Sequence, residues 1–119
     1  MASFTDLDVW KKARLLRNNI TEITREFPVE EKYRLVDQII RSSRSIGNII
    51  AEGHGRFHYL YASKFLITAR GSSSETIDHL IIALDNNLIS VEMFDCLKAD
   101  CEECSSMING YISYLNSKA

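Results

Sequence analysis

Apolar side chains recur at steps of three and four residues along four successive segments of the chain. In the first segment, about residues 5–27, the repeat comprises Val9, Ala13, Leu16, Ile20, Ile23 and Phe27. Such alternating steps keep the apolar side chains on one face of an α-helix. Thr5 is the predicted N-cap, with Asp8 three residues later. Pro28 disfavours helical backbone at the residue before it, so we predict a helix over about residues 5–27.

Two adjacent apolar seams run along the second segment, about residues 29–53. Their members are Leu35, Ile39, Ser42, Ile46 and Ile49 in one seam, and Val36, Ile40, Ser43 and Ile50 in the other. Two seams side by side predict a helix whose broad buried face contacts two neighbours. Pro28 suits the first turn of this helix, and Gly53 is predicted to end it. The opposite side carries Arg34, Asp37, Arg41, Arg44, Asn48 and Glu52.

The third segment, about residues 57–87, keeps the helical repeat through a run of small residues. The repeat comprises Tyr59, Ala62, Leu66, Ala69, Ser73, Ile77, Leu80 and Leu84. Gly71 begins a Gly-Ser-Ser-Ser run in its middle, and glycine inside a helix costs about 1 kcal/mol relative to alanine. Because the repeat does not slip there, we predict that another backbone approaches closely at Gly71. Asn86 and Asn87 predict a turn after this helix.

The fourth segment, about residues 90–117, has the most regular heptad repeat and a predicted N-cap at Ser90. The repeat comprises Phe94, Leu97, Cys101, Cys104, Ile108, Tyr111 and Leu115. Four helices joined by short turns predict a single all-α domain over residues 1–119, an antiparallel up-down-up-down four-helix bundle. Helices of about 20–30 residues form a narrow rod with a large lateral surface, which favours self-association.

The amino-acid composition supports long helices and favours one cellular compartment. The 119 residues include one proline and five glycines, too few for a fold of many short strands and turns. No apolar run is long enough to span a membrane, and the N-terminal stretch MASFTDLDVWKK interrupts the apolar run that a signal peptide needs. Three cysteines, an odd number, fit free thiols in a reducing compartment. We therefore expect a cytoplasmic protein.

Opposite charges separate along the chain, although the net charge is only −2. Residues 1–70 contain twelve Lys and Arg against eight Asp and Glu, which gives +4, whereas residues 71–119 contain two against eight, which gives −6. A uniformly basic footprint, which is typical of nucleic-acid binders, is therefore missing. The basic half could contact phosphate, or the acidic half of another copy, or both halves could simply be solvated.

The turn between the second and third helices contains the residues that most resemble a site. His54-Gly55-Arg56 resembles a phosphate cradle, but no strand precedes it and neither common glycine-rich phosphate motif is complete. His54 and His58, with Glu52, could be imagined as metal ligands, although the glycines between them disfavour one continuous helix. We interpret this segment as a helix end and a turn, without a bound metal or cofactor.

Three further sets of reactive side chains have structural interpretations. Cys101 and Cys104 have a redox-like or zinc-like spacing, but both fall on the apolar repeat and are predicted core residues. His79 is expected at the surface or at a subunit interface. Glu52 and Glu75 could serve as an acid–base pair, but the favoured interpretation is a polar network at the second turn or across a subunit contact. That network comprises Glu52, Arg56, Ser72 and Glu75.

Several motifs in the middle of the chain resemble those of one protein family. They read F-P-x-x-E-x-Y-x-L from Phe27, Q-x-x-R from Gln38, S-I from Ser45, A-E-G-x-G-R from Ala51 and A-x-G-S-x-x-E from Ala69. Together with F-x-D-L-x-V-W near the N-terminus, they resemble the small bacterial four-helix-bundle proteins encoded in intervening sequences of 23S ribosomal RNA genes. The resemblance implies the bundle and a homo-oligomer, typically a homopentamer. Relatives include accessory proteins of diversity-generating retroelements, which bind a reverse transcriptase and nucleic acid.

Three functions follow in order of preference. The first is a non-enzymatic oligomeric scaffold or adaptor. The second is a nucleic-acid-binding accessory protein, with Arg41, Arg44, Arg56, Lys64 and Arg70 as phosphate contacts. The third is an enzyme with a carboxylate or metal centre near residues 52–58. We predict no catalytic, cofactor-binding or metal-ligating residue under the preferred function.

Overall fold

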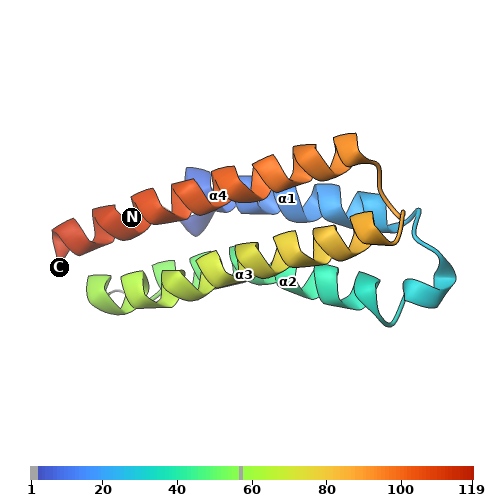
Figure 1. Ribbon diagram of the computed structural model, residues 1–119. Coiled ribbons are helices and arrows are strands. Elements are labelled where there is room, and N and C mark those ends of the chain that lie inside the picture. Colours follow the sequence, from blue (N-terminus) through green and yellow to red (C-terminus); the bar gives the residue numbers. More distant parts are fainter. Residues whose placement is uncertain (1–2, 57) are drawn as a thin grey trace.

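Four long helices run up and down in the structure, a computed structural model that describes residues 3–56 and 58–119 (Figure 1). They are α1 (Asp8–Thr24), α2 (Leu35–His54), α3 (Tyr59–Asp85) and α4 (Val91–Lys118). The described residues contain no strand, and the molecule measures 46 × 23 × 20 Å. The predicted antiparallel four-helix bundle is confirmed.

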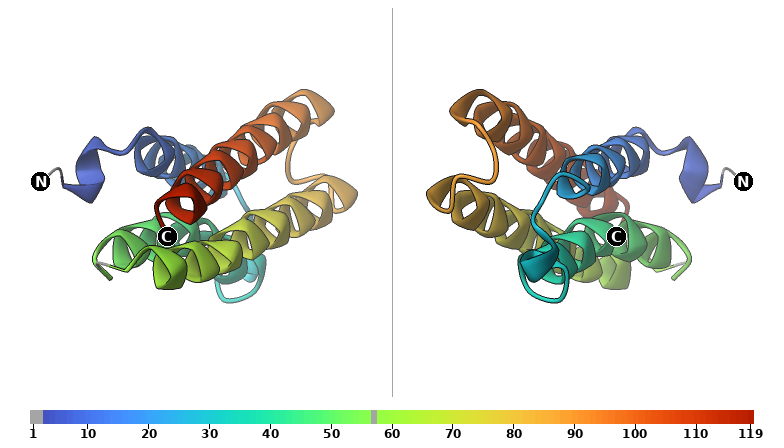
Figure 2. Two further views of the ribbon diagram at one scale, coloured as in Figure 1. Left: turned by 90° about the vertical axis from the view of Figure 1, so that its left-hand side faces the viewer. Right: turned by 90° about the vertical axis from the view of Figure 1, so that its right-hand side faces the viewer.

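Each helix packs against two neighbouring helices (Figure 2). α2 contacts α1 and α3, and α4 contacts α3 and α1, so that α1 and α3 are diagonal to each other. Lys12 on α1 binds Asp100 and Glu103 on α4, at N···O distances of 3.1 and 3.0 Å. This ion-pair group ties the first helix to the last at the contact that closes the bundle.

The predicted apolar repeats form the core. Its main cluster includes Val9, Ala13, Leu16, Ile20, Ile39, Ile46, Ile50, Leu66, Leu80, Leu97, Cys101, Cys104, Ile108 and Leu115. A second cluster of Phe27, Leu35 and Ala83 covers the end of the bundle near the α1–α2 connection. Cys101 and Cys104 have no exposed surface, which confirms their prediction as core residues.

The N-cap at the start of the first helical segment was predicted at the wrong residue. Ser3, not Thr5, is the capping residue, and it caps a short 3-10 helix, η1 (Phe4–Asp6). The Ser3 hydroxyl accepts a hydrogen bond from the Thr5 amide at 3.2 Å, and the Ser3 amide donates to the Asp6 carboxylate at 3.2 Å. The capping pair is therefore Ser3 with Asp6, and the extended residue Leu7 separates it from α1.

The second helix is shorter than predicted at its start. Pro28 is extended and leads into a 3-10 helix, η2 (Val29–Glu31), and α2 begins only at Leu35. The physical reason is the lack of a buried face, because Val29 and Tyr33 are 77% and 84% exposed. α1 likewise ends at Thr24, before the predicted residue 27.

The predicted end of the second helix at Gly53 is wrong by one residue. α2 continues to His54, with Gly55 as its C-cap in right-handed conformation. Gly53 is buried, and a Cβ there would lie 3.6 Å from a Phe65 ring carbon and 3.7 Å from Leu66 Cγ. Gly53 therefore packs against α3, and an added Cβ would make ordinary van der Waals contacts there. The third helix begins at Tyr59, and the predicted start at residue 57 lies outside the described residues.

The connection between α3 and α4 follows the predictions. Asn87 has a positive φ of 58°, which asparagine tolerates better than most residues, and it forms the turn with Asn86. The Ser90 hydroxyl accepts a hydrogen bond from the Met93 amide at 3.0 Å, as an N-cap should. None of the helices in residues 3–56 and 58–119 has the length and apolar character needed to cross a membrane.

Replacement of Ser90 by alanine tests this cap. Because an amide at the start of α4 would lose its acceptor, we expect Ser90→Ala to lower the free energy of unfolding by about 1 kcal/mol. Ser90→Asn should restore most of it. Urea denaturation measures the change, and Ser113→Ala, at an exposed position of the same helix, is the matched control. Equal unfolding midpoints for Ser90→Ala and Ser113→Ala would contradict the assigned cap.

Thiol labelling tests the burial of the cysteine pair. Burial raises the pKa of Cys101 to about 12 and that of Cys104 to about 11, whereas Cys96 is exposed. At about pH 8 the two buried thiols therefore stay protonated as well as shielded. We expect a disulfide reagent such as DTNB to modify only Cys96 rapidly in the native protein, and all three thiols after unfolding. Rapid reaction of three thiols in the native protein would show that the α4 seam is not buried.

Candidate functional site

The polar side of α2 faces solvent, as its spacing predicted. Arg41 pairs with Asp37 at 3.3 Å and Arg56 pairs with Glu52 at 3.2 Å, each across one helical turn. All four side chains are about half exposed or more, so these pairs add little stability. They do neutralise two of the arginines on this side of the helix, whereas Arg44 forms no ion pair with any described residue.

The four residues predicted to share a polar network form two separate groups. Glu52 and Arg56 pair with each other at the C-terminal end of α2. Ser72 and Glu75 lie in the middle of α3, where the Ser72 hydroxyl is 3.0 Å from that of Ser45. Within one chain, the structure therefore does not bring the four side chains together at the turn between α2 and α3.

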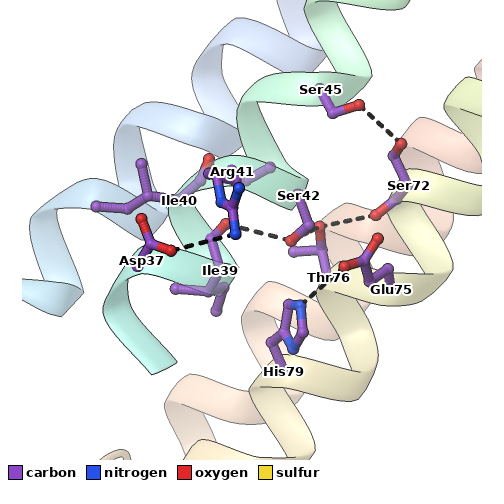
Figure 3. Close-up of polar contacts among 11 residues, drawn as sticks. Asp37, Ile39, Ile40, Arg41, Ser42, Ser45, Ser72, Glu75, Thr76 and His79 are labelled. Atoms are coloured by element: carbon purple, nitrogen blue, oxygen red, sulfur yellow. Dashed lines mark hydrogen bonds and ion pairs between the residues drawn. The ribbon is translucent and has the colours of Figure 1, made fainter. Parts of the chain in front are cut away.

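A ladder of hydroxyl groups joins the middle of α2 to α3 (Figure 3). The Thr76 hydroxyl lies 2.9 Å from the Ser42 hydroxyl and 2.9 Å from the Ser72 carbonyl oxygen. One turn before Thr76 on α3, the Ser72 hydroxyl faces the Ser45 hydroxyl of α2. Buried hydroxyls need such partners, because an unpaired one costs about 1–3 kcal/mol. The ladder therefore favours one register between the two helices.

A second set of hydroxyl contacts joins α3 to α4. The Ser73 hydroxyl donates to the Cys101 carbonyl at 3.0 Å, and the Ser105 hydroxyl donates to Ser73 at 2.9 Å. The Gly-Ser-Ser-Ser run thus uses its two middle residues for helix packing: Ser72 contacts α2 and Ser73 contacts α4. Gly71 and Ser74 are turned outward.

The prediction of a close backbone approach at Gly71 is wrong within the chain. A Cβ at this position would meet no heavy atom within 4 Å. The glycine instead lies on an exposed strip that follows one face of α3, with apolar side chains 49%, 49% and 40% exposed at Leu60, Ile67 and Ile81. We call the set of Leu60, Ile67, Gly71, Ser74 and Ile81 the outer α3 stripe.

His79, which was predicted at the surface or at a subunit interface, is buried within the chain, so the predicted surface position is wrong. The residue is only 7% exposed. It lies three residues beyond Thr76 and seven beyond Ser72, which places all three on the α3 face directed toward α2. Its Nε2 is 3.2 Å from the Glu75 carboxylate, while Nδ1 is buried without a hydrogen-bond partner among the described residues (Figure 3).

The two histidines near the second turn have different partners. His54 ends α2, and its Nδ1 is 3.3 Å from the Tyr111 hydroxyl. His58 precedes α3 and packs edge-to-face on Tyr61, with ring centroids 5.1 Å apart. Across the described residues, no three His, Cys, Asp or Glu side chains converge as metal ligands would. Gly55 is right-handed, so the turn lacks the left-handed glycine of an anion-binding nest.

The five basic residues predicted to contact phosphate do not form one patch. Arg41 and Arg56 are paired with carboxylates, and Arg70 donates to the Asn109 side chain on α4 at 2.8 Å. Lys64 lines a hollow of similar size with His58, Leu60 and Tyr61 at the start of α3. Arg44 is the member that lines a polar site together with a second arginine.

That site is a groove between α1 and α2 that sequence reasoning missed. It is lined by Arg17, Asn18 and Thr21 of α1 and by Arg44 and Asn48 of α2. We call it the α1–α2 groove, and its volume is about 330 Å³. Two guanidinium groups and two amides line it without a carboxylate, so it is electropositive.

The Trp10 ring and a glycine hold one of these arginines in place. The guanidinium carbons of Arg14 and Arg17 both lie 5.8 Å from the centroid of the Trp10 ring, a cation–π distance. Gly47 on α2 is buried beside them, and a Cβ there would be 3.6 Å from both Arg17 Nη1 and Trp10 Nε1. Arg17 therefore lies against α2 beside Gly47.

Comparison with known proteins identifies the family. The family model of the 23S rRNA-intervening sequence protein matches residues 5–110. Among solved structures, the fold is similar to the crystal structure of a protein of unknown function from the S23 ribosomal protein family of Bacteroides thetaiotaomicron. The two share 23% sequence identity with a TM-score of 0.79, over 87% of this chain and 97% of that one.

Comparison of the sequence with curated proteins found no significant match. The family match covers most of the sequence and includes all of the motifs in the second and third segments. The chain therefore belongs to the family of 23S rRNA-intervening sequence proteins.

Proposed function

We propose that this protein is a non-enzymatic scaffold or adaptor that acts as a homo-oligomer. The observation that carries the proposal is the outer α3 stripe. Leu60, Ile67 and Ile81 are each at least 40% exposed on one face of α3, and exposed apolar side chains grouped on one face commonly mark protein–protein contacts. α3 packs against both α2 and α4, so the backbone that carries the stripe is held in place.

The glycine in this stripe supports a close contact with a second molecule. Gly71 lies inside an α-helix, where alanine would be more stable by about 1 kcal/mol, and no packing within the chain requires it. A helix from another copy could approach its bare backbone closely. Ser74, one turn later, is a second small side chain on the same surface.

The charge distribution favours contacts between unlike surfaces. Residues 8–54, which include α1 and α2, contain nine basic and seven acidic residues, whereas residues 59–118 contain four basic and eight acidic residues. An acidic side of one copy therefore faces most favourably the basic side of the next. Contacts between unlike surfaces close into rings when the rotation permits. The charge distribution therefore supports a ring, and the family resemblance implies that the ring has five members.

Light scattering at micromolar concentration tests the assembly. We expect a mass that is a multiple of the 13.6 kDa chain, and about five times this mass if the ring has five members. A monomer mass over the full concentration range would contradict the proposal.

Substitutions in the outer α3 stripe locate the contact. Ile67→Glu would bury a charge in the subunit contact, so we expect the mass to fall to that of the monomer while the helical circular dichroism is unchanged. Val29→Glu, at a side chain that is 77% exposed near the end of the bundle, is the matched control and should keep the wild-type mass. If Ile67→Glu also keeps that mass, the stripe is not the contact.

A further inference from the structure

The α1–α2 groove concentrates positive charge that the protein leaves uncompensated. Neither Arg17 nor Arg44 forms an ion pair with another described residue, although four of the other basic side chains do: Lys12, Arg25, Arg41 and Arg56. The carboxylates nearest along α2 and α1 are engaged elsewhere, since Glu52 binds Arg56 and Glu22 binds Arg25. Two like charges placed across one groove repel each other, so an anion between them would relieve this repulsion.

The groove is built to hold its donors in place. Arg17 is partly buried, with its guanidinium over the Trp10 ring and against the backbone of Gly47. A guanidinium fixed in this way loses less conformational entropy on binding a ligand than a free surface arginine does. The Thr21 hydroxyl already donates to the Arg17 carbonyl at 2.9 Å, so the free donors of the groove are the two guanidiniums and the amides of Asn18 and Asn48.

The number and kind of donors indicate the chemical class of the ligand. Each guanidinium offers a planar fork that matches two oxygens of a carboxylate or phosphate, and each amide adds two N–H groups. A carboxylate has two oxygens in one plane with about four acceptor sites, whereas a phosphate presents three or four oxygens around one centre and can accept from donors on both sides of the groove. Asn18, Arg44 and Asn48 are exposed, so the group can enter while attached to a larger molecule.

We propose that the α1–α2 groove binds a phosphate group, with Arg17 and Arg44 as its charged contacts and Asn18 and Asn48 as amide donors. The phosphate belongs either to a small free phosphate compound or to the backbone of a nucleic acid. This site differs from the basic set predicted from the sequence, with which it shares only Arg44. It also lies on α1 and α2, away from the outer α3 stripe, so it does not depend on the proposed assembly.

Calorimetric titration of the full chain with pyrophosphate, and anisotropy titration with a fluorescent single-stranded RNA, separate the two sources. Trp10 is the chain's one tryptophan and lies under Arg17, so ligand entry should also change the protein's fluorescence. Saturable pyrophosphate binding assigns the site to small phosphate compounds. RNA binding without pyrophosphate binding assigns it to a nucleic-acid backbone. If neither ligand binds at low salt, the proposal is overturned.

The double variant Arg17→Gln/Arg44→Gln tests whether binding occurs in the groove. Each lost charge-assisted contact should weaken binding roughly tenfold, and the salt dependence of RNA binding should become less steep by about one phosphate contact per arginine. The matched control, Lys32→Gln/Arg34→Gln, removes the same net charge from exposed positions outside the groove and should bind almost as the wild type does. Equal losses in the two double variants would show non-specific attraction and overturn the proposal.

A nearly isosteric variant and a mass measurement complete the test. Asn48→Asp places a carboxylate one turn from Arg44 and should abolish phosphate binding without changing the fold. Asn116→Asp on α4 is its control and should leave phosphate binding unchanged.

Light scattering of Arg17→Gln/Arg44→Gln should return the wild-type mass. A fall in mass, together with no phosphate binding by the wild type, would assign the groove to a carboxylate of a second copy and refute the phosphate site.

Discussion

Burial of the isoleucine seams of α2 between α1 and α3 is the constraint on which the rest of this structure depends. Ile39, Ile46 and Ile50 have no exposed surface, and each contributes about 1.5–3 kcal/mol by leaving water. Once these seams are buried, Gly47 faces α1 and Gly53 faces α3, and the charged side of α2 can only face solvent. The surface chemistry of the protein is therefore positioned by its core.

The same constraint separates two surfaces that a scaffold could use independently. α1 and α3 are diagonal in the bundle, so the groove beside Arg17 and the outer α3 stripe lie over different parts of the molecule. One surface is polar and electropositive, and the other is apolar with a bare backbone at Gly71. Assembly through the stripe would repeat the groove once per subunit, and several weak phosphate sites on one particle can bind a polyanion tightly.

Periodicity predicted the parts of the fold that depend on burial alone. The four apolar repeats identified the helices and the core positions of Cys101 and Cys104, because a repeat of three and four has one helical interpretation. Helix starts were less accurate, since Ser3 and Thr5 offer competing caps and only the exposure of Val29 and Tyr33 shows why α2 starts late. His79 was misplaced because a polar side chain was assumed to face outward.

The candidate site could not be predicted from spacing, because it is formed between helices. Arg17 and Arg44 are far apart in the sequence, and their proximity depends on the antiparallel register of α1 and α2. Gly47 was the one residue in the sequence that pointed to this site. A glycine within a helical repeat indicates close packing, but it does not show which side chain packs there. The same reasoning was wrong for Gly71, whose surroundings within the chain are empty.

Amide hydrogen exchange, followed residue by residue, tests the central role of the α2 seams most directly. If burial of these seams holds the bundle together, the amides of residues 39–50 should exchange only through global unfolding, with protection equal to the full free energy of unfolding. The same protection should extend to the facing residues of α3. Faster exchange in the middle of α2 than in α1 and α4 would show that the bundle persists without this contact, and would contradict the account.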